Sequence, residues 1–238
     1  MGISSRDYMR EWPTRRLGQI SAITVIIGIN ILIFLLWRFR DHTFLQENFM
    51  VNLGRLKDGR LWTPLTSVFS HYHMMHLFIN MFVLWSFGTV LERQWGTRRF
   101  VIFYLSAGVV ASLAHCFLSL LGMRDGSALG ASGAVSGLVL AFCILHPRHT
   151  VLLFGLIPMP AFVMALLFIG IDVFGLMGQL GQRGTVGGTQ IGHGAHLGGA
   201  AFAALYMLLG RSRALQFRRS RRSSRPSPAT FSTLNRTP

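Results

Sequence analysis

The stretch of sequence that decides the fold is residues 130–145, GASGAVSGLVLAFCIL. It opens with two glycines that flank a serine and continues as an apolar run. The run stops at His146-Pro147, because the residue before a proline disfavours helical geometry. As a helix it would be about 22 Å long at ~1.5 Å per residue, against a bilayer hydrocarbon core of about 30 Å. The stretch therefore predicts a short membrane span that begins below the membrane surface.

Other apolar runs of similar character lie along the chain, at residues 19–37, 74–91, 100–121, 161–178 and 195–209. Hydrophobic residues make up 51% of the 238 residues and charged residues only 13%, against roughly 25% charged residues in a soluble domain. This composition argues against a soluble protein and against a chain that is disordered as a whole. We predict an all-α membrane protein whose residues 19–210 form a bundle of six transmembrane helices.

The positive charge is concentrated at the two ends of the chain. The net charge is +15, and residues 211–238 carry eight arginines and no acidic residue. We expect residues 211–238 to form a basic disordered tail. Basic segments face the cytoplasm, so this tail and the N-terminal segment 1–18 are predicted to be cytoplasmic, with a bacterial inner membrane as the simplest location. The expected partner of the charge is the lipid bilayer, through anionic headgroups, and not nucleic acid.

The segment between the first two predicted spans, residues 38–70, differs from both. It combines charged residues, glycines and Pro64 with scattered large apolar side chains such as Phe44 and Trp62. Amphipathic segments of this kind lie in the membrane interface. We therefore predict a long first loop that lies in the interface.

The last apolar run is also short, and it begins with the residues GHGAH at 192–196. Irregular backbone at membrane depth is tolerated only where it is buried in protein or lines a water-filled cavity. Glycines four residues apart in this run and in residues 132–145 allow two helix backbones to approach closely. Ser132 and His196 are therefore expected near the floor of one cavity that opens to the outside.

This pair of residue types has a known chemistry. A serine hydroxyl becomes a nucleophile when a neighbouring base takes its proton, and histidine is the usual base because its pKa is near neutral. A helix N-terminus also offers free backbone N–H groups that can stabilise an oxyanion. His71, His76 and Asn80, at the second run, add polar groups that are costly in a membrane and therefore indicate function.

Together these residues resemble the rhomboid family of intramembrane serine proteases. The resemblance covers roughly residues 20–210 and rests on three motifs in order, which are His71-x4-His76-x3-Asn80, Gly130-Ala131-Ser132-Gly133, and Ala195-His196 followed by Gly198-Gly199. It implies a six-helix rhomboid-type bundle. It also implies that Ser132 is the nucleophile and His196 the general base of a dyad without an acidic third member.

The resemblance implies further roles. Asn80 and His76, with the Ser132 backbone N–H, would form the oxyanion hole, while His71, Gly130 and Gly133 would support the site. The fifth helix would be the gate through which a substrate helix enters. Substrates would be transmembrane segments of other membrane proteins, and neither a cofactor nor a metal is implied. One departure concerns the bracing of the first loop, because Trp62-Thr63 stands where many bacterial members carry Trp-Arg.

Other interpretations stay open. A catalytically inactive rhomboid-like protein that binds transmembrane clients would have the same fold, although the intact Ser132 and His196 argue against it. Asp172, midway along the fifth run, suggests an ion transporter, which should show internal repeats that this sequence lacks. His73 and His76 have a spacing that suits zinc, but no intramembrane acid accompanies them. We expect Asp172 to face the cavity or to bond a neighbouring helix. His193 either lines the cavity or is a polar loop residue, and the second is favoured.

Overall fold

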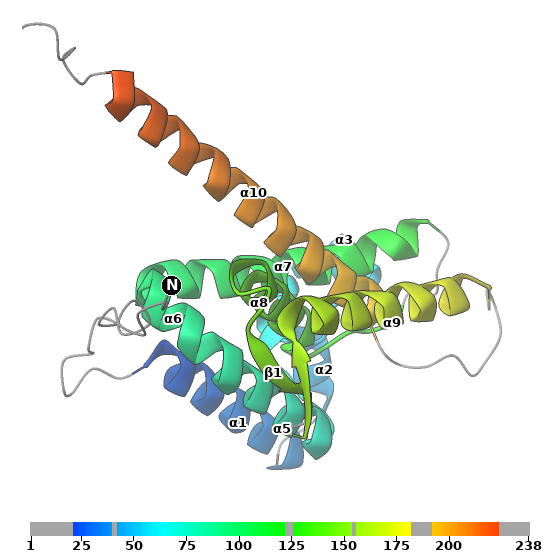
Figure 1. Cartoon of the computed structure of the whole chain (residues 1–238). Helices are drawn as coiled ribbons and strands as arrows, with labels where there is room; N and C mark the ends of the chain where they lie inside the picture. The colour runs from blue at the N-terminus through cyan, green and yellow to red at the C-terminus, as the bar shows by residue number, and fades with distance from the viewer. Residues whose placement is uncertain (1–20, 40–41, 122–125, 154–155, 182–191, 224–238) are drawn as a thin grey trace, which may run out of the picture. The chain divides into compact units, whose positions relative to one another are not determined.

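The fold was established from a computed structural model, which describes residues 21–39, 42–121, 126–153, 156–181 and 192–223. The regular structure of these residues is almost entirely helical (Figure 1). The main helices, in chain order, are α1 (Ala22–Phe39), α5 (Met74–Val83), α6 (Thr89–Trp95), α7 (Thr97–Leu120), α8 (Ser132–Leu145), α9 (Ala161–Gly181) and α10 (His193–Ser223). A π-helical turn, η3 (Leu84–Gly88), joins α5 to α6. The predicted all-α fold is confirmed, and each of the six apolar runs falls on a helix.

Four of the helical segments are long and apolar enough to cross a membrane: Ala22–Phe39, Met74–Trp95, Thr97–Leu120 and Ala161–Gln179. The helix α8 is apolar but shorter, and its bounds are those predicted from the sequence. It is also the most enclosed helix, because nine of its side chains or glycines are buried, among them Leu138 and Phe142. The short predicted span is therefore an interior helix, which α7 and α9 both contact.

The helix α10 continues past residue 210, where we predicted a disordered tail. The helix extends to Ser223. Residues 211–223 contain arginine, alanine, leucine and glutamine and no glycine or proline, and this composition favours a helix. The contacts divide the chain into one unit of residues 1–204 and a second of residues 205–238. The site described below lies within the first. The predicted N-terminal segment 1–18 and residues 224–238 lie outside the described residues.

The first loop folds into three short helices, α2 (His42–Phe49), α3 (Leu53–Lys57) and α4 (Thr63–Thr66), followed by a 3-10 turn, η2 (Ser67–Phe69). Its core is a cluster in which Leu45 packs with Trp37 of α1. The indole of Trp37 also donates a 2.8 Å hydrogen bond to the Ser70 hydroxyl. Phe44 and Leu61 are exposed by 62% and 73%, as expected of side chains that contact a membrane interface.

A short hairpin joins α8 to α9 and was not predicted. Its strands are β1 (Thr150–Leu153) and β2 (Ile157–Pro160), paired antiparallel with Leu152 opposite Pro158. Residues 157–160 contain two prolines, which break a helix, and no strand was predicted there. In a two-stranded ribbon each strand is an edge, where proline is tolerated because its missing N–H can face outward.

The start of α1 is fixed by a buried carboxylate. Glu92 of α6 accepts hydrogen bonds from the Ser21 hydroxyl at 2.7 Å and from the Ala22 backbone N–H at 3.1 Å. It also accepts one from the Thr97 hydroxyl at 2.9 Å. A carboxylate at a helix N-terminus satisfies backbone N–H groups that have no partner within the helix. Glu92 thus ties α1 to the α6–α7 corner.

Candidate active site

The helices α8 and α10 meet through glycine. A Cβ atom on Gly199 would overlap the carbonyl oxygen of Gly133, and one on Gly137 would lie 2.9 Å from the Gly199 carbonyl oxygen. A Cβ on Gly133 would also lie 3.3 Å from the carbonyl oxygen of Ala195. The two backbones are therefore in direct contact, as the glycine spacing predicted. Ser132 adjoins Gly133 and His196 adjoins Ala195 in the chain, so each of the two predicted catalytic residues lies next to this backbone contact.

Ser132 is the first residue of α8, and the turn before it has a special geometry. Gly130 has a φ of +124°, and a Cβ there would lie 2.7 Å from the ring of His76. Only glycine fits both conditions. The Gly130 N–H donates to the Ser67 carbonyl at 2.9 Å, and the Ala131 N–H donates to His71 Nε2 at 3.3 Å. His71 and the carbonyl of Ser67 therefore hold the backbone of the turn that leads into Ser132.

His71 is fully buried and lies just before α5. Burial, with a smaller contribution from His76, lowers the pKa of His71 from 6.5 to about 3. A neutral imidazole has one bare ring nitrogen, and here the contact with the Ala131 N–H assigns that role to Nε2. His71 therefore stays uncharged at neutral pH and acts as a fixed hydrogen-bond acceptor.

The two residues predicted for the oxyanion hole lie on α5. The ring of His76 is 5.0 Å from that of His71, centroid to centroid, and His76 interacts electrostatically with His196. Asn80 is buried, and its Nδ2 donates to the backbone carbonyl of His76 at 2.9 Å. His76 thus lies beside the residues around Ser132. For Asn80 the structure shows a bond within its own helix.

An acidic residue lies against the predicted base. Oδ1 of Asp172, on α9, is 3.0 Å from Nδ1 of His196 and 2.8 Å from Nδ1 of His193. The side chains of Asp172 and His193 are only 13% and 7% exposed. Asp172 therefore bonds a neighbouring helix, which is one of the two outcomes expected for it. The favoured expectation, that His193 is a polar loop residue, was wrong, because this residue is buried at the start of α10.

These three side chains are also the one group among the described residues with donor atoms arranged to hold a metal ion. Their ligand atoms lie within 4.8 Å of one another. The two short distances, 2.8 and 3.0 Å, are those of ordinary hydrogen bonds from imidazole N–H groups to a carboxylate. Hydrogen bonding alone therefore accounts for the arrangement.

The first loop braces the segment that precedes Ser132. Val51 and Ala128 exchange two backbone hydrogen bonds, of 2.9 and 2.8 Å. The side chains of Asn52 and Arg55 both donate to the hydroxyl of Ser127, at 3.1 and 2.8 Å. This loop therefore fixes the position of the turn that leads into the site.

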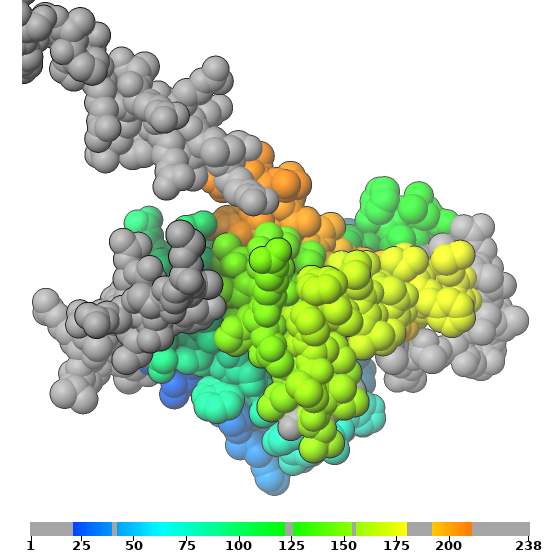
Figure 2. Space-filling model, viewed as in Figure 1, coloured from blue at the N-terminus to red at the C-terminus, as the bar shows by residue number. Residues whose placement is uncertain are grey.

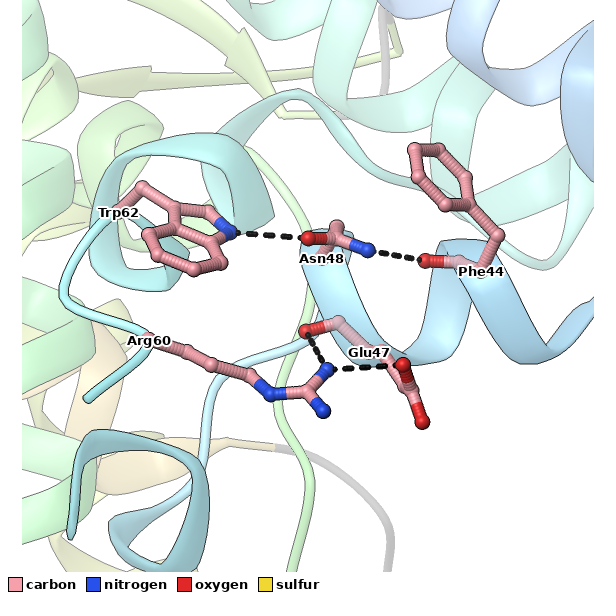
Figure 3. Close-up of polar contacts among 5 residues, drawn as sticks. All are labelled: Phe44, Glu47, Asn48, Arg60 and Trp62. Atoms are coloured by element: carbon pink, nitrogen blue, oxygen red, sulfur yellow. Dashed lines mark hydrogen bonds and ion pairs between the residues drawn. The ribbon is translucent and has the colours of Figure 1, made fainter. Parts of the chain in front are cut away.

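The loop has its own polar bracing despite the missing Trp-Arg pair (Figure 3). The Trp62 indole N–H donates to the Asn48 side-chain oxygen at 3.1 Å. The Arg60 guanidinium lies 3.0 Å from the Glu47 carboxylate. Arg60, two residues before Trp62, thus supplies a bracing cation in this loop, where many bacterial members of the family have an arginine directly after the tryptophan.

A shallow groove runs along α9 toward the histidines. Its volume is about 600 Å³. It is lined by His193 and by six residues of α9, which are Leu166, Leu167, Gly170, Ile171, Phe174 and Gly175. Its walls are mainly apolar. The helix α9 is exposed along the face shown in Figure 2, where it is coloured yellow, and only 11% of its most apolar 18-residue window is buried. The groove leads from this exposed face to the buried His193.

Comparisons with known proteins agree with these features. The family model described as "Rhomboid domain" matches residues 58–213. The RHOMBOID-like protein 12, mitochondrial, of Arabidopsis thaliana is 36% identical over 206 residues, which are 79% of this chain and 59% of that protein. The presenilin-associated rhomboid-like protein, mitochondrial, of Homo sapiens is 32% identical over 209 residues, which are 86% of this chain and 53% of that protein.

A fungal relative extends the comparison. Rhomboid protein 1, mitochondrial, of Saccharomyces cerevisiae is 31% identical over 189 residues, which are 77% of this chain and 51% of that protein. The chain therefore spans between half and three fifths of the length of these curated relatives. The family-model match covers the helices that carry Ser132 and His196.

Proposed function

The chain belongs to the rhomboid family, and on that premise we propose that it is an intramembrane serine endopeptidase that cleaves transmembrane segments of other membrane proteins. It is an integral membrane protein, since the family match accompanies four helices apolar enough to cross a bilayer. The observation that carries the proposal is the backbone contact of α8 with α10 at Gly133 and Gly199. That contact supports a joint role for Ser132 and His196, because each is the chain neighbour of a residue that takes part in it.

In the proposed reaction, Ser132 Oγ attacks the scissile carbonyl carbon while His196 Nε2 takes the hydroxyl proton. The carbonyl oxygen becomes an oxyanion, which backbone N–H groups at the start of α8 stabilise together with His76 and Asn80. An amide nitrogen carries two N–H donors, so the bond of Asn80 to the His76 carbonyl leaves a second donor for this role. His196 then gives its proton to the leaving amine. Water hydrolyses the acyl-enzyme by the reverse proton path.

The expected substrate is a helix that is easily unwound. Every backbone carbonyl of a stable membrane helix is hydrogen-bonded within the helix, so none is open to attack. Glycine or proline near the scissile bond would free one. The apolar groove along α9 supports approach of such a segment from the lipid on this side, with α9 acting as the gate.

The names of the relatives bear on the location. The plant, human and yeast proteins reported above are all named mitochondrial. Their names favour a mitochondrial membrane over the bacterial inner membrane expected from the sequence. Fractionation of cells that express the tagged chain from its own gene tests this location.

Cleavage by purified protein tests the proposed activity. The chain is reconstituted in liposomes with a fluorescent transmembrane peptide that carries a glycine near its outer end. We expect cleavage by the wild type, none by Ser132→Ala, and labelling of the wild type at Ser132 by a fluorophosphonate. Ser136→Ala, one turn further along α8, is the matched control and should retain both activities.

The outcome also separates the competing functions. Binding of the peptide without cleavage or labelling would favour an inactive rhomboid-like protein that holds transmembrane clients. Cleavage that persists in Ser132→Ala would eliminate the serine mechanism. Cleavage that a chelator stops would point to metal chemistry instead.

A further inference from the structure

We propose that Asp172 is the positioning residue of His196, so that the working unit is Ser132, His196 and Asp172 rather than a two-residue dyad. The inference rests on the proposed function of the same site. It goes beyond the resemblance, which implies no acidic member.

The geometry gives Asp172 a defined task. Its Oδ1 lies 3.0 Å from Nδ1 of His196, within the range of an N–H···O hydrogen bond. A carboxylate is an acceptor only, so the proton of neutral His196 must be on Nδ1. Nε2 is then left bare, as a base that takes the serine proton requires. In the reaction Asp172 takes no proton but stabilises the imidazolium that forms on His196.

His193 completes the environment of the carboxylate. Its Nδ1 lies 2.8 Å from the same Oδ1 atom, and its ring is packed against α9, because a Cβ on Gly175 would overlap it. The carboxylate of Asp172 is therefore held between two imidazoles of α10. Two N–H donors that share one oxygen limit how far the carboxylate can rotate, which is how a partner residue fixes the orientation of a catalytic base.

A purely structural role makes a different prediction. Were Asp172 only a polar link between α9 and α10, the shorter bond to His193 would serve as well as the bond to His196. The two imidazoles thus provide a matched pair. Loss of His193 should affect packing, while loss of the carboxylate should affect the chemistry of His196.

Steady-state cleavage by Asp172→Asn, His193→Gln and Val173→Ala tests the proposal. We expect Asp172→Asn to lower kcat by about tenfold or more with KM within about twofold, because the substrate groove is unchanged. Asp172→Glu should recover part of the loss. Val173→Ala, an exposed neighbour of Asp172 on α9 that does not line the groove, should stay close to wild type. Equal losses of kcat in Asp172→Asn and His193→Gln, with lower folding yields in both, would overturn the proposal.

The pH profile gives a readout that packing alone would not move. The titratable groups that face His196 are His76 of α5, Asp172 of α9 and His193 of α10. Asp172 is the only anion among these three. Its removal destabilises the imidazolium, so the acidic limb of the kcat profile should shift to lower pH in Asp172→Asn. An unshifted limb would contradict the proposal.

A spectroscopic test does not depend on cleavage. In protein labelled with ¹⁵N-histidine, His196 should show the Nδ1–H tautomer in the wild type and a mixture of tautomers in Asp172→Asn. His196→Gln identifies its signals, and a chelator is present throughout to exclude bound metal. An unchanged tautomer would overturn the role of Asp172 even in an active protease. An inactive wild type with the expected tautomers would overturn the proposed protease while leaving the bond established.

Discussion

The two sides of the site are built in opposite ways. On the side of Ser132, α8 and α10 touch through backbone atoms, and added Cβ atoms on Gly133 or Gly199 would overlap their neighbours. On the other side, a Cβ on Gly170 or Gly178 of α9 would meet nothing within 4 Å, although one on Gly175 would overlap the ring of His193. The most apolar window of α9 is 11% buried, against 33% for that of α7. The segment with the predicted nucleophile is therefore fixed by close backbone packing, whereas α9 is the less enclosed helix and meets both histidines through the carboxylate of Asp172.

The largest effect on the packing of α8 against α10 is expected from a larger side chain at Gly199. In Gly199→Ala the new methyl group meets the carbonyl oxygen of Gly133, so the two helices must separate. We expect a loss of about 2–3 kcal/mol in the free energy of unfolding, as for other overpacked interiors, and a large fall in cleavage. Unfolding in mixed detergent and SDS micelles measures the first effect. Gly178→Ala on α9 is the matched control, and an equal loss there would refute the contrast.

The corner that anchors α1 tests whether the rigid side extends beyond the glycine contact. Glu92→Gln keeps the shape of the side chain but replaces the charged carboxylate, which accepts three hydrogen bonds, with a neutral amide. We expect a cost of about 1–3 kcal/mol, since hydrogen bonds to buried charged groups are strong. Glu47→Gln, which loses a half-exposed ion pair with Arg60, should cost less than about 1 kcal/mol. Similar costs in both variants would show that burial of Glu92 adds nothing.

The support of Ser132 by His71 should make stability depend on pH. Burial lowers the pKa of His71 from 6.5 to about 3. Between these values the unfolded chain binds a proton that the folded chain does not. The free energy of unfolding should therefore fall as pH drops below about 6.5, by up to ~1.4 kcal/mol per pH unit. Unfolding measured from pH 7.5 to pH 5 gives this slope.

A substitution assigns that slope to one residue. His71→Gln retains an acceptor for the Ala131 N–H but does not titrate in this range, so it should flatten the pH dependence. His73→Gln changes an exposed neighbour and should leave the slope as in the wild type. A slope unchanged by His71→Gln would show that another group is responsible.

The smallest effect is expected on α9. Gly170→Ala adds a methyl group where nothing lies within 4 Å, and alanine favours helix over glycine by about 0.5–1 kcal/mol. We expect a slight gain in stability, measured as above. A loss of stability similar to that of Gly199→Ala would mean that α9 is packed as tightly as α8, which would contradict the difference between the two sides of the site.

Much of this architecture could be predicted from the sequence. Long apolar runs predicted the positions of the main helices, because a segment that crosses a bilayer must be apolar. The helix α8 has the predicted bounds. Glycines four residues apart identified the contact beside Ser132 and His196. The β1–β2 hairpin was missed, because its prolines read only as breakers. The helical part of residues 211–223 was missed because the arginine-, serine- and proline-rich composition of residues 211–238 as a whole was taken to mean disorder.

The pairing of Asp172 with His196 was beyond sequence reasoning for a different reason. An acid in an apolar run signals function, and that signal was present. Which residue Asp172 contacts depends on the rotation of α9 about its axis and on its shift along α10. Neither quantity can be read from a single sequence. The same holds for Val51 and Ala128, whose backbone groups pair without any requirement on their side chains.

The position of Asp172 on α9 has a consequence for the order of events during a turnover. The helix that would step aside to admit a substrate also carries the carboxylate bonded to His196. Any outward movement of α9 would take that partner away, so admission and hydrolysis could not occur at the same moment. A segment that enters and leaves before α9 returns would escape uncut. Selection among membrane proteins would then depend on how long a segment stays, and not only on which residues it presents.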